Sequence, residues 1–256
     1  IVEGPNDATF IRSLIELKTG IPFDRQDLLI IPAGGKDLVA DLAAFLKDLG
    51  VNWVSIFDWD ACIGTSTPLF QSALSPQDVL DLEAACSTLR AKLATLPNRE
   101  SKAEKIVTAM ILELLGVPPA AVVNFTGSIV ERFLARHWPL SAIELSTLAA
   151  AVQRLQPRKC LRILKQKKIW VWSSTLEEVI LKTTQSENEV DTIVRNRGLL
   201  NQAFQDDAQR RRALIGCLHR CSHHPEIMRE ITERLWTVGA FDSSEVKQAV
   251  NFILES

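Results

Sequence analysis

The stretch Ile1-Val2-Glu3-Gly4-Pro5-Asn6-Asp7 opens the chain, and Ile56-Phe57-Asp58-Trp59-Asp60 follows further along. In both stretches a short apolar run of β type leads directly into acidic residues. An open α/β sheet builds its sites in the crevice at the carboxyl ends of its strands. Carboxylates gathered there repel one another unless a cation neutralises them. The two stretches therefore predict a parallel sheet with a divalent metal site at its carboxyl edge, and phosphoryl chemistry that depends on Mg²⁺.

Residues 1–60 alternate between strand and helix patterns. Apolar residues recur at helical spacing over residues 8–18 and 37–49, and short apolar runs predict strands at 28–31 and 53–57. Such a βαβαβ unit implies parallel strands joined by right-handed crossovers. The predicted fold class is therefore α/β.

The pattern becomes helical beyond this unit. Residues 75–116 form a predicted helical insertion, and the strand pattern resumes at 121–125 and 169–172. The last part of the chain shows only helical patterns. The predicted organisation is a catalytic α/β domain over residues 1–185, which contains the insertion, followed by a C-terminal helical subdomain over 186–256.

The composition is that of an ordinary globular protein, with 46% hydrophobic residues in a chain of 256. A formal net charge of −2 gives no overall attraction to nucleic acid, so binding to a polyanion requires local segregation of charge. One run of basic residues contains no acid: Arg154, Arg158, Lys159, Arg162, Lys165, Lys167 and Lys168. Both a solvated helix face and a patch that contacts phosphates fit this run.

Five cysteines and no secretory signal favour a reducing compartment. No apolar stretch approaches the roughly 20 residues that a membrane span needs. We therefore expect a cytoplasmic protein without a membrane partner. The first residue is Ile1, and Ile1-Val2 has the character of the tail of a strand, so we expect the chain to be a fragment of a longer polypeptide.

The four acids of the two opening stretches differ in how well a structural role explains them. Asp7 falls in a first helical turn, where the helix dipole favours an acid, so a capping role is open to it. Glu3 directly precedes Gly-Pro and has no capping role, which favours a function. Asp58 and Asp60 flank one residue, and in an extended segment both carboxylates point to the same side of the sheet. Turn formation is the alternative for these two.

Two later segments, Ser128-Ile129-Val130-Glu131 and Ser174-Thr175-Leu176-Glu177, fit the capping-box pattern. On spacing alone both serine–glutamate pairs are structural. They follow the two later predicted strands, at the same expected edge of the sheet as the other acids. Glu131 and Glu177 are therefore also candidate metal ligands, and Glu178 competes with Glu177 for that role.

Other motifs carry weaker signals. Gly34-Gly35-Lys36 offers bare backbone amides to a phosphate but lacks the Walker A spacing, so no nucleotide hydrolysis is expected from this chain. Cys217, Cys221 and His224 share one face of a predicted helix. The paired Cys-x-x-Cys spacing of zinc sites is absent, so burial in the core is favoured over zinc. His219 has no partner at a diagnostic spacing.

The arrangement Val2-Glu3-Gly4-x-x-Asp7, followed by Ile56-Phe57-Asp58-x-Asp60 after a βαβαβ run, resembles the Toprim domain shared by topoisomerases, DnaG-type primases and OLD-family nucleases. Thr126-Gly127-Ser128-x-x-Glu131, and the strand that leads into Leu176-Glu177, are most similar to the nuclease half of OLD (overcoming lysogenization defect) family proteins. The similarity covers approximately residues 1–185. One departure is that Trp172-Ser173-Ser174-Thr175 lacks the glycine often found there.

The resemblance implies a Toprim-like, Rossmann-like parallel sheet flanked by helices, with a helical insertion and a C-terminal helical appendage. It also implies a module that follows an ABC-type ATPase domain of the same polypeptide and assembles as a homo-oligomer. Such a module cuts DNA with two divalent cations, Mg²⁺ or Mn²⁺, and ATP acts only through the ATPase domain. The implied metal ligands or ligand supports are Glu3, Asp7, Asp58, Asp60, Ser128, Glu131 and Glu177.

The resemblance further implies a catalytic role for Glu3, Asp58 and Asp60 and for one lysine that stabilises the transition state. The lysines in the region are Lys165, Lys167, Lys168 and Lys182. Lys168, at the foot of the last strand, is the preferred one.

The predicted function is a metal-dependent endonuclease or nickase that acts on DNA, and the family context suggests defence against phage or foreign DNA. The residues expected to contact the nucleic-acid backbone are Arg158, Lys159, Arg162 and Lys165. Strand rejoining through a covalent tyrosyl intermediate is excluded within this chain, which contains no tyrosine. Cleavage of RNA and a non-catalytic module that binds nucleic acid or a partner stay open as alternatives.

Overall fold

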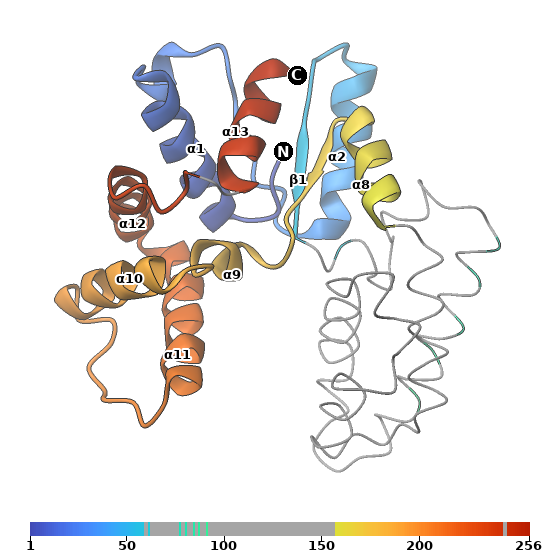
Figure 1. Cartoon of the computed structure of the whole chain (residues 1–256). Helices are drawn as coiled ribbons and strands as arrows, with labels where there is room; N and C mark the ends of the chain where they lie inside the picture. The colour runs from blue at the N-terminus through green and yellow to red at the C-terminus, as the bar shows by residue number, and fades with distance from the viewer. Residues whose placement is uncertain are drawn as a thin grey trace. The chain divides into compact units, whose positions relative to one another are not determined.

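The computed structural model describes residues 1–58, 157–242 and 245–256, together with isolated positions between 61 and 91 (Figure 1). The chain divides into two compact units, of which the first joins Ile1–Trp59 to Lys168–Ser256 and the second is Asp60–Lys167. The insertion predicted at 75–116 lies outside the described residues except for single positions, and the strand predicted at 121–125 lies wholly outside them.

The sheet of the first unit is parallel. β1 (Ser55–Phe57) pairs with β2 (Ile169–Val171), with Ser55 opposite Ile169. Val2 forms parallel bridges with Pro32 on one side and with Ile56 of β1 on the other. Hydrogen bonds of 3.0 Å from Val2 N–H to the Ile31 carbonyl and of 2.9 Å from Ile56 N–H to the Ile1 carbonyl support this order. The segment around Val2 therefore lies between Pro32 and β1. The parallel pairing confirms the predicted α/β class.

The helices predicted at 8–18 and 37–49 are present as α1 (Pro5–Thr19) and α2 (Lys36–Asp48). α1 begins earlier than predicted because Gly4 is its N-cap and Pro5 its first residue, a position where a missing N–H is tolerated. It ends at Gly20, whose φ of 68° lies in the left-handed region that glycine adopts without strain. Figure 1 shows α1 on one side of β1 and α2 on the other.

The remaining described helices follow β1 in the sequence. They are α8 (Pro157–Gln166), α9 (Leu176–Ile180), α10 (Thr184–Asn196), α11 (Asp207–Arg220), α12 (Pro225–Thr237) and α13 (Glu245–Glu255). Short 3-10 turns occur at η1 (Phe23–Arg25) and η5 (Cys221–His223). Thr183 and Asp206 cap α10 and α11 by accepting hydrogen bonds from the backbone N–H of Ser186 and Gln209.

One hydrophobic core joins the sheet to the C-terminal helices. Its members come from both ends of the chain, and examples are Val2, Phe10, Ile56, Trp172, Leu218, Ile231 and Val250. The ring of Phe10 contacts Trp172 edge-on at 6.4 Å and Phe241 at 5.9 Å, both between ring centroids. The helices after residue 185 are therefore packed into the same compact unit as the sheet, and the division expected at 185 does not coincide with a boundary between the two units.

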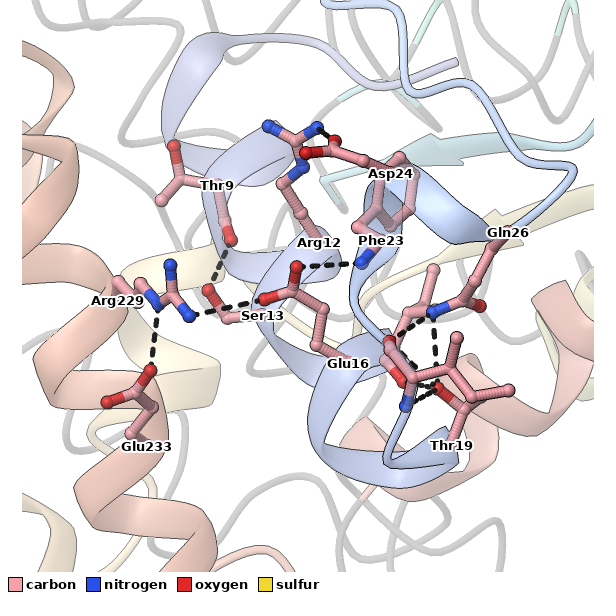
Figure 2. A network of polar contacts seen from close by, with 12 residues as sticks. Thr9, Arg12, Ser13, Glu16, Thr19, Phe23, Asp24, Gln26, Arg229 and Glu233 are labelled. Carbon is pink, nitrogen blue, oxygen red and sulfur yellow. Dashed lines mark hydrogen bonds and ion pairs between the residues drawn. The ribbon is translucent and has the colours of Figure 1, made fainter.

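Polar contacts along α1 fix the neighbouring segments (Figure 2). Glu16 accepts a hydrogen bond of 2.9 Å from the backbone N–H of Phe23, and its second oxygen lies 3.5 Å from Arg229 of α12. Arg12 forms an ion pair of 2.7 Å with Asp24. These contacts tie η1 and α12 to α1. Within the described part of the chain, no helix combines the length and apolar character needed to cross a membrane.

Candidate metal-binding site

Glu3 and Asp58 stand at the point where the strand order reverses. From Val2 the chain passes through α1 to Pro32 on one side, and then through α2 to β1 on the other side of Val2. A ligand crevice forms at such a switch point, at the carboxyl ends of the two diverging strands. Glu3 directly follows Val2, and Asp58 directly follows β1. The topology therefore places both acids at the carboxyl ends of these neighbouring segments.

Hydrogen bonds connect the two acids to each other and to α9. Glu3 Oε1 accepts a bond of 2.9 Å from the backbone N–H of Asp58. Asp58 Oδ1 in turn accepts a bond of 3.0 Å from the backbone N–H of Leu176, the first residue of α9. Both contacts are partly buried, so the carboxylates are held in fixed orientations at the edge of the sheet.

Asp7 has the capping role that the sequence left open. Its Oδ2 accepts a hydrogen bond of 3.1 Å from the backbone N–H of Gly4, which completes the N-terminal cap of α1. Burial raises the pKa of Asp7 to about 6, although the hydrogen bonds from its own N–H and from Gly4 oppose this change. The negative charge of Glu177 raises the pKa further. Asp7 and Glu177 therefore concentrate negative charge beside the start of α1.

Glu177 is buried and pairs with a residue that the sequence did not single out. One carboxylate oxygen lies 3.0 Å from Nδ1 of His219 at the end of α11. Burial by itself would raise the pKa of Glu177, but the hydrogen bond and charge of His219 outweigh it and hold that pKa below its usual value. No spacing rule links two residues so far apart in the sequence, so only the packing of α9 against α11 reveals the pair.

The capping box predicted for Ser174 and Glu177 is wrong by one residue. Thr175 is the N-cap of α9, and its hydroxyl accepts a hydrogen bond from the backbone N–H of Glu178. The carboxylate of Glu178 bonds to the Ser174 hydroxyl. Glu178 thus occupies the third helical position, and the buried carboxylate of Glu177 contacts His219 and the Thr175 side chain.

Lys168 is not brought to the acids. It precedes β2, and its Nζ contacts Asn52 Oδ1 and the Ser256 carbonyl. A residue before a parallel strand lies at the amino edge of the sheet, whereas Asp58 follows β1 at the carboxyl edge. The length of the paired strands separates Lys168 from the acids, which argues against the catalytic role predicted for it.

Lys182 lies towards the carboxyl edge instead. Ser173, two residues beyond β2, donates from its backbone N–H and from its hydroxyl to the carboxylate of Glu245. Lys182 Nζ lies 3.5 Å from the same carboxylate. Of the lysines that the sequence offered, Lys182 is therefore connected to the end of β2 where the acids are.

The other predicted site residues divide into three groups. Asp60, Ser128 and Glu131 lie outside the described residues. α8 of the second unit contains Arg158 and Lys159, and also Arg162 and Lys165, whose side chains are exposed. Cys217 and Cys221 are free and buried in the core.

The side-chain oxygens of the two acids are the kind of ligand that a hard divalent cation binds. Glu3 and Asp58 supply carboxylate oxygens, which Mg²⁺ prefers. Burial is the main cause of the raised pKa of Asp7, and the negative charge of Glu177 adds to it. In the segments that the structure describes, no three metal-binding side chains of His, Cys, Asp or Glu gather closely enough to hold an ion.

Open α/β proteins bind their ligands at the carboxyl ends of the strands, at such a switch point. Residues 1–60 match the family model described as overcoming lysogenization defect protein-like, TOPRIM domain. This match supports a Toprim domain of the OLD type, and the helix-rich α/β fold with its parallel strands is consistent with it. Toprim domains generally bind divalent metals, and the match suggests a nuclease type of function. No curated protein and no solved structure matches the chain.

Proposed function

We propose that the chain is a metal-dependent endonuclease or nickase domain that hydrolyses phosphodiester bonds of DNA. The observation that carries the proposal is the hydrogen bond from Asp58 N–H to Glu3 Oε1 across the switch point. Both acids lie in the segment that matches an OLD-like Toprim domain. Two neighbouring carboxylates can bind a divalent cation, and such a cation can catalyse hydrolysis of a phosphodiester bond.

Glu3 and Asp58 would hold two Mg²⁺ or Mn²⁺ ions together with Asp60 and Glu131, and Asp7 and Ser128 would support them. When bound, the ions would supply the attacking hydroxide and stabilise the leaving oxygen. The protein's own contribution is orientation: Leu176 N–H fixes Asp58 Oδ1, and Asp58 N–H fixes Glu3 Oε1. Fixed carboxylates need no rearrangement when charge develops on the phosphate.

Lys182 is the lysine that we propose to stabilise the transition state, in place of Lys168. Its connection to Ser173 through Glu245 supports this choice. The basic residues of α8 are proposed to hold the nucleic-acid backbone without reading bases, and the exposure of Arg162 and Lys165 supports that role.

The OLD-like character of residues 1–60 also motivates proposals about context. The domain would follow an ABC-type ATPase domain in the same polypeptide, act as a homo-oligomer in the cytoplasm, and contribute to defence against phage or foreign DNA. ATP would act on it only through that ATPase domain.

Incubation of the purified chain with supercoiled plasmid and Mg²⁺, Mn²⁺ or EDTA tests the proposal. We expect metal-dependent nicking or linearisation that Glu3→Ala and Asp58→Ala abolish. Asp24→Ala is the matched control, because Asp24 is an exposed acid whose partner is the exposed Arg12 of α1. An RNA of the same sequence, tested in parallel, shows whether the chain cleaves DNA, RNA or both. Folded protein that cuts neither nucleic acid with either metal would favour a non-catalytic binding module.

A further inference from the structure

α11 begins with three consecutive arginines, and the structure gives them two different roles. Arg210 and Arg211 pair with acids of α10, the first with Asp191 at 3.1 Å and the second with Glu187. Arg212 is exposed, and its Nε donates to the backbone carbonyl one turn earlier in the same helix. The charges of the first two arginines are therefore neutralised within the fold, whereas the charge of Arg212 is presented to solvent.

Arg220 lies on the same face of α11 as Arg212, two turns further along the helix. Residues four apart share a face of an α-helix, so Arg212, Gly216 and Arg220 form one line, which we call the arginine line. Arg220 is exposed, and Gly216 adds no side chain between the two arginines. At 1.5 Å per residue the two arginines are about 12 Å apart along the helix axis. Residues 208–225 include no acid, so this stretch of chain presents only positive charge.

Both guanidinium groups have donors left for a ligand. Arg220 uses Nη2, which donates to the Leu199 carbonyl and to the Cys217 sulfur, both at 3.1 Å. Arg212 uses Nε. A guanidinium has five N–H donors, and its planar fork matches the oxygens of a phosphate. Among the residues that the structure describes, neither side chain belongs to an ion pair. The arginine line therefore has the charge and the donors that bind phosphate groups.

Hydrogen bonds connect both halves of α11 to segments of the proposed nuclease site. Arg211 donates at 2.6 Å to the carbonyl of the residue before Lys182. Asn6, buried at the start of α1, donates from Nδ2 to the Leu218 carbonyl at 2.9 Å. Glu3 precedes Asn6 by three residues, so their Cα atoms are at most about 11 Å apart. The helix that carries the arginine line thus contacts the segments that carry Lys182 and Glu3.

We propose that the arginine line of α11 binds the sugar-phosphate backbone of the nucleic acid that the site cleaves. This inference rests on the proposed function and adds a second binding surface to the one proposed on α8. Phosphates of one strand follow one another every 3.4 Å along a duplex, so a line of about 12 Å spans roughly three to four of them. Contacts with phosphates hold the substrate and do not read its bases.

The test measures binding of a short fluorescently labelled DNA duplex in EDTA at several salt concentrations. Each phosphate contact contributes about 0.9 to the slope of log K against log salt concentration. Replacing both Arg212 and Arg220 by alanine should therefore lower the magnitude of this slope by about 2. Arg234→Ala is the matched control, because Arg234 is 52% exposed and its charge is paired with Glu189 at 2.8 Å. The control should keep the parent's slope, and a double variant that also keeps it overturns the inference.

Arg220→Lys separates the charge of Arg220 from its bond to the Leu199 carbonyl. Lysine keeps the cation and lacks the planar fork. If Arg220 acts through its charge, Arg220→Ala should lower the slope by about 1 and Arg220→Lys should keep it. Equal losses in both variants would assign the effect to the structural bond and overturn the binding role of Arg220.

The plasmid assay gives a second readout and distinguishes this inference from the proposed function. The double variant should raise the KM for plasmid more than it lowers kcat. If the unaltered chain cuts, Glu3→Ala does not, and the double variant has the parent's KM and slope, only the binding role of α11 fails. If the unaltered chain binds the duplex through the two arginines and cuts neither DNA nor RNA with either metal, the proposed hydrolysis fails and the binding role holds. A folded chain that neither binds nor cuts contradicts both.

Discussion

Glu3 Oε1 accepts a hydrogen bond of 2.9 Å from the backbone N–H of Asp58 where the strand order reverses. Glu3→Gln keeps an acceptor oxygen at this place and removes the negative charge. We therefore expect the free energy of unfolding without metal to change by less than about 1 kcal/mol. Metal ions that bind only the folded protein add about 2.7 kcal/mol at 100 times their Kd. Melting curves with and without Mg²⁺ should show this increase for the parent and not for Glu3→Gln.

Asp24→Asn serves as the control for that comparison, because it removes an acid of the same chain from an exposed ion pair with Arg12. It should retain the full increase with Mg²⁺. A Glu3→Gln protein that is stabilised by Mg²⁺ as much as the parent would remove Glu3 from the ligand set.

The raised pKa of Asp7 predicts that the stability of the fold depends on pH. Burial raises its pKa to about 6 in the folded protein, against about 3.9 in an unfolded chain. The folded state then binds the proton more tightly, so stability from this group is fully present below pH 4 and is lost as the pH rises to about 6. The charged form costs roughly 3 kcal/mol at neutral pH, at 1.36 kcal/mol per unit of pKa.

Asp7→Asn removes this charge and keeps an oxygen for the Gly4 N–H. We expect the variant to be more stable than the parent at pH 7, with the difference shrinking towards pH 4. Urea unfolding at pH 4, 5, 6 and 7 measures it. Glu177 has the opposite trend, because its lowered pKa contributes stability that is lost as the pH falls. The difference between the two proteins therefore reports Asp7 together with its electrostatic interaction with Glu177. A variant that is less stable at pH 7 would contradict the expectation.

The local rules of the sequence located β1, β2, the first helices and the two acids at the switch point, whereas the strand predicted at 28–31 is present only as an isolated bridge at Pro32. Glu3 and Asp58 directly follow apolar segments, and the parallel topology brings the ends of those segments together. The sequence did not show at which edge of the sheet Lys168 lies. Polar residues flank β2 on both sides, with a lysine before the strand and serines after it. Strand direction, and not nearness to a strand in sequence, decides which end reaches the acids.

Two further features depended on long-range packing. Ser174 and Thr175 are both good caps, so the sequence alone did not fix the start of α9, and with it the direction of Glu177. His219 became a partner of Glu177 only because α11 packs against α9. An amphipathic pattern shows that a helix has a buried face, but it does not name what that face covers.

Asn6 links the start of α1 to the end of α11. Its substitution tests how much this link contributes to the stability of the unit that contains the acids. Asn6→Ala deprives the Leu218 and His219 carbonyls of a buried donor, which should lower the free energy of unfolding by about 1–3 kcal/mol. Asn188→Ala removes an exposed contact with Arg210 and should change it by less than about 0.5 kcal/mol. Urea denaturation of the three proteins gives both values. Equal effects of the two substitutions would show that the link through Asn6 contributes little.

Lys182 and Lys168 stand near opposite ends of β2, so their alanine variants form a matched pair. If Lys182 stabilises the charge of the transition state, Lys182→Ala should lower plasmid cleavage by about 100-fold or more. Lys168→Ala should leave cleavage unchanged, because Lys168 Nζ contacts Asn52 at the amino edge of the sheet. Single-turnover rates at saturating Mg²⁺ measure this without interference from metal affinity. The reverse result, with cleavage lost only in Lys168→Ala, would mean that substrate reaches the amino edge and would contradict the placement of the site at the carboxyl ends of the strands.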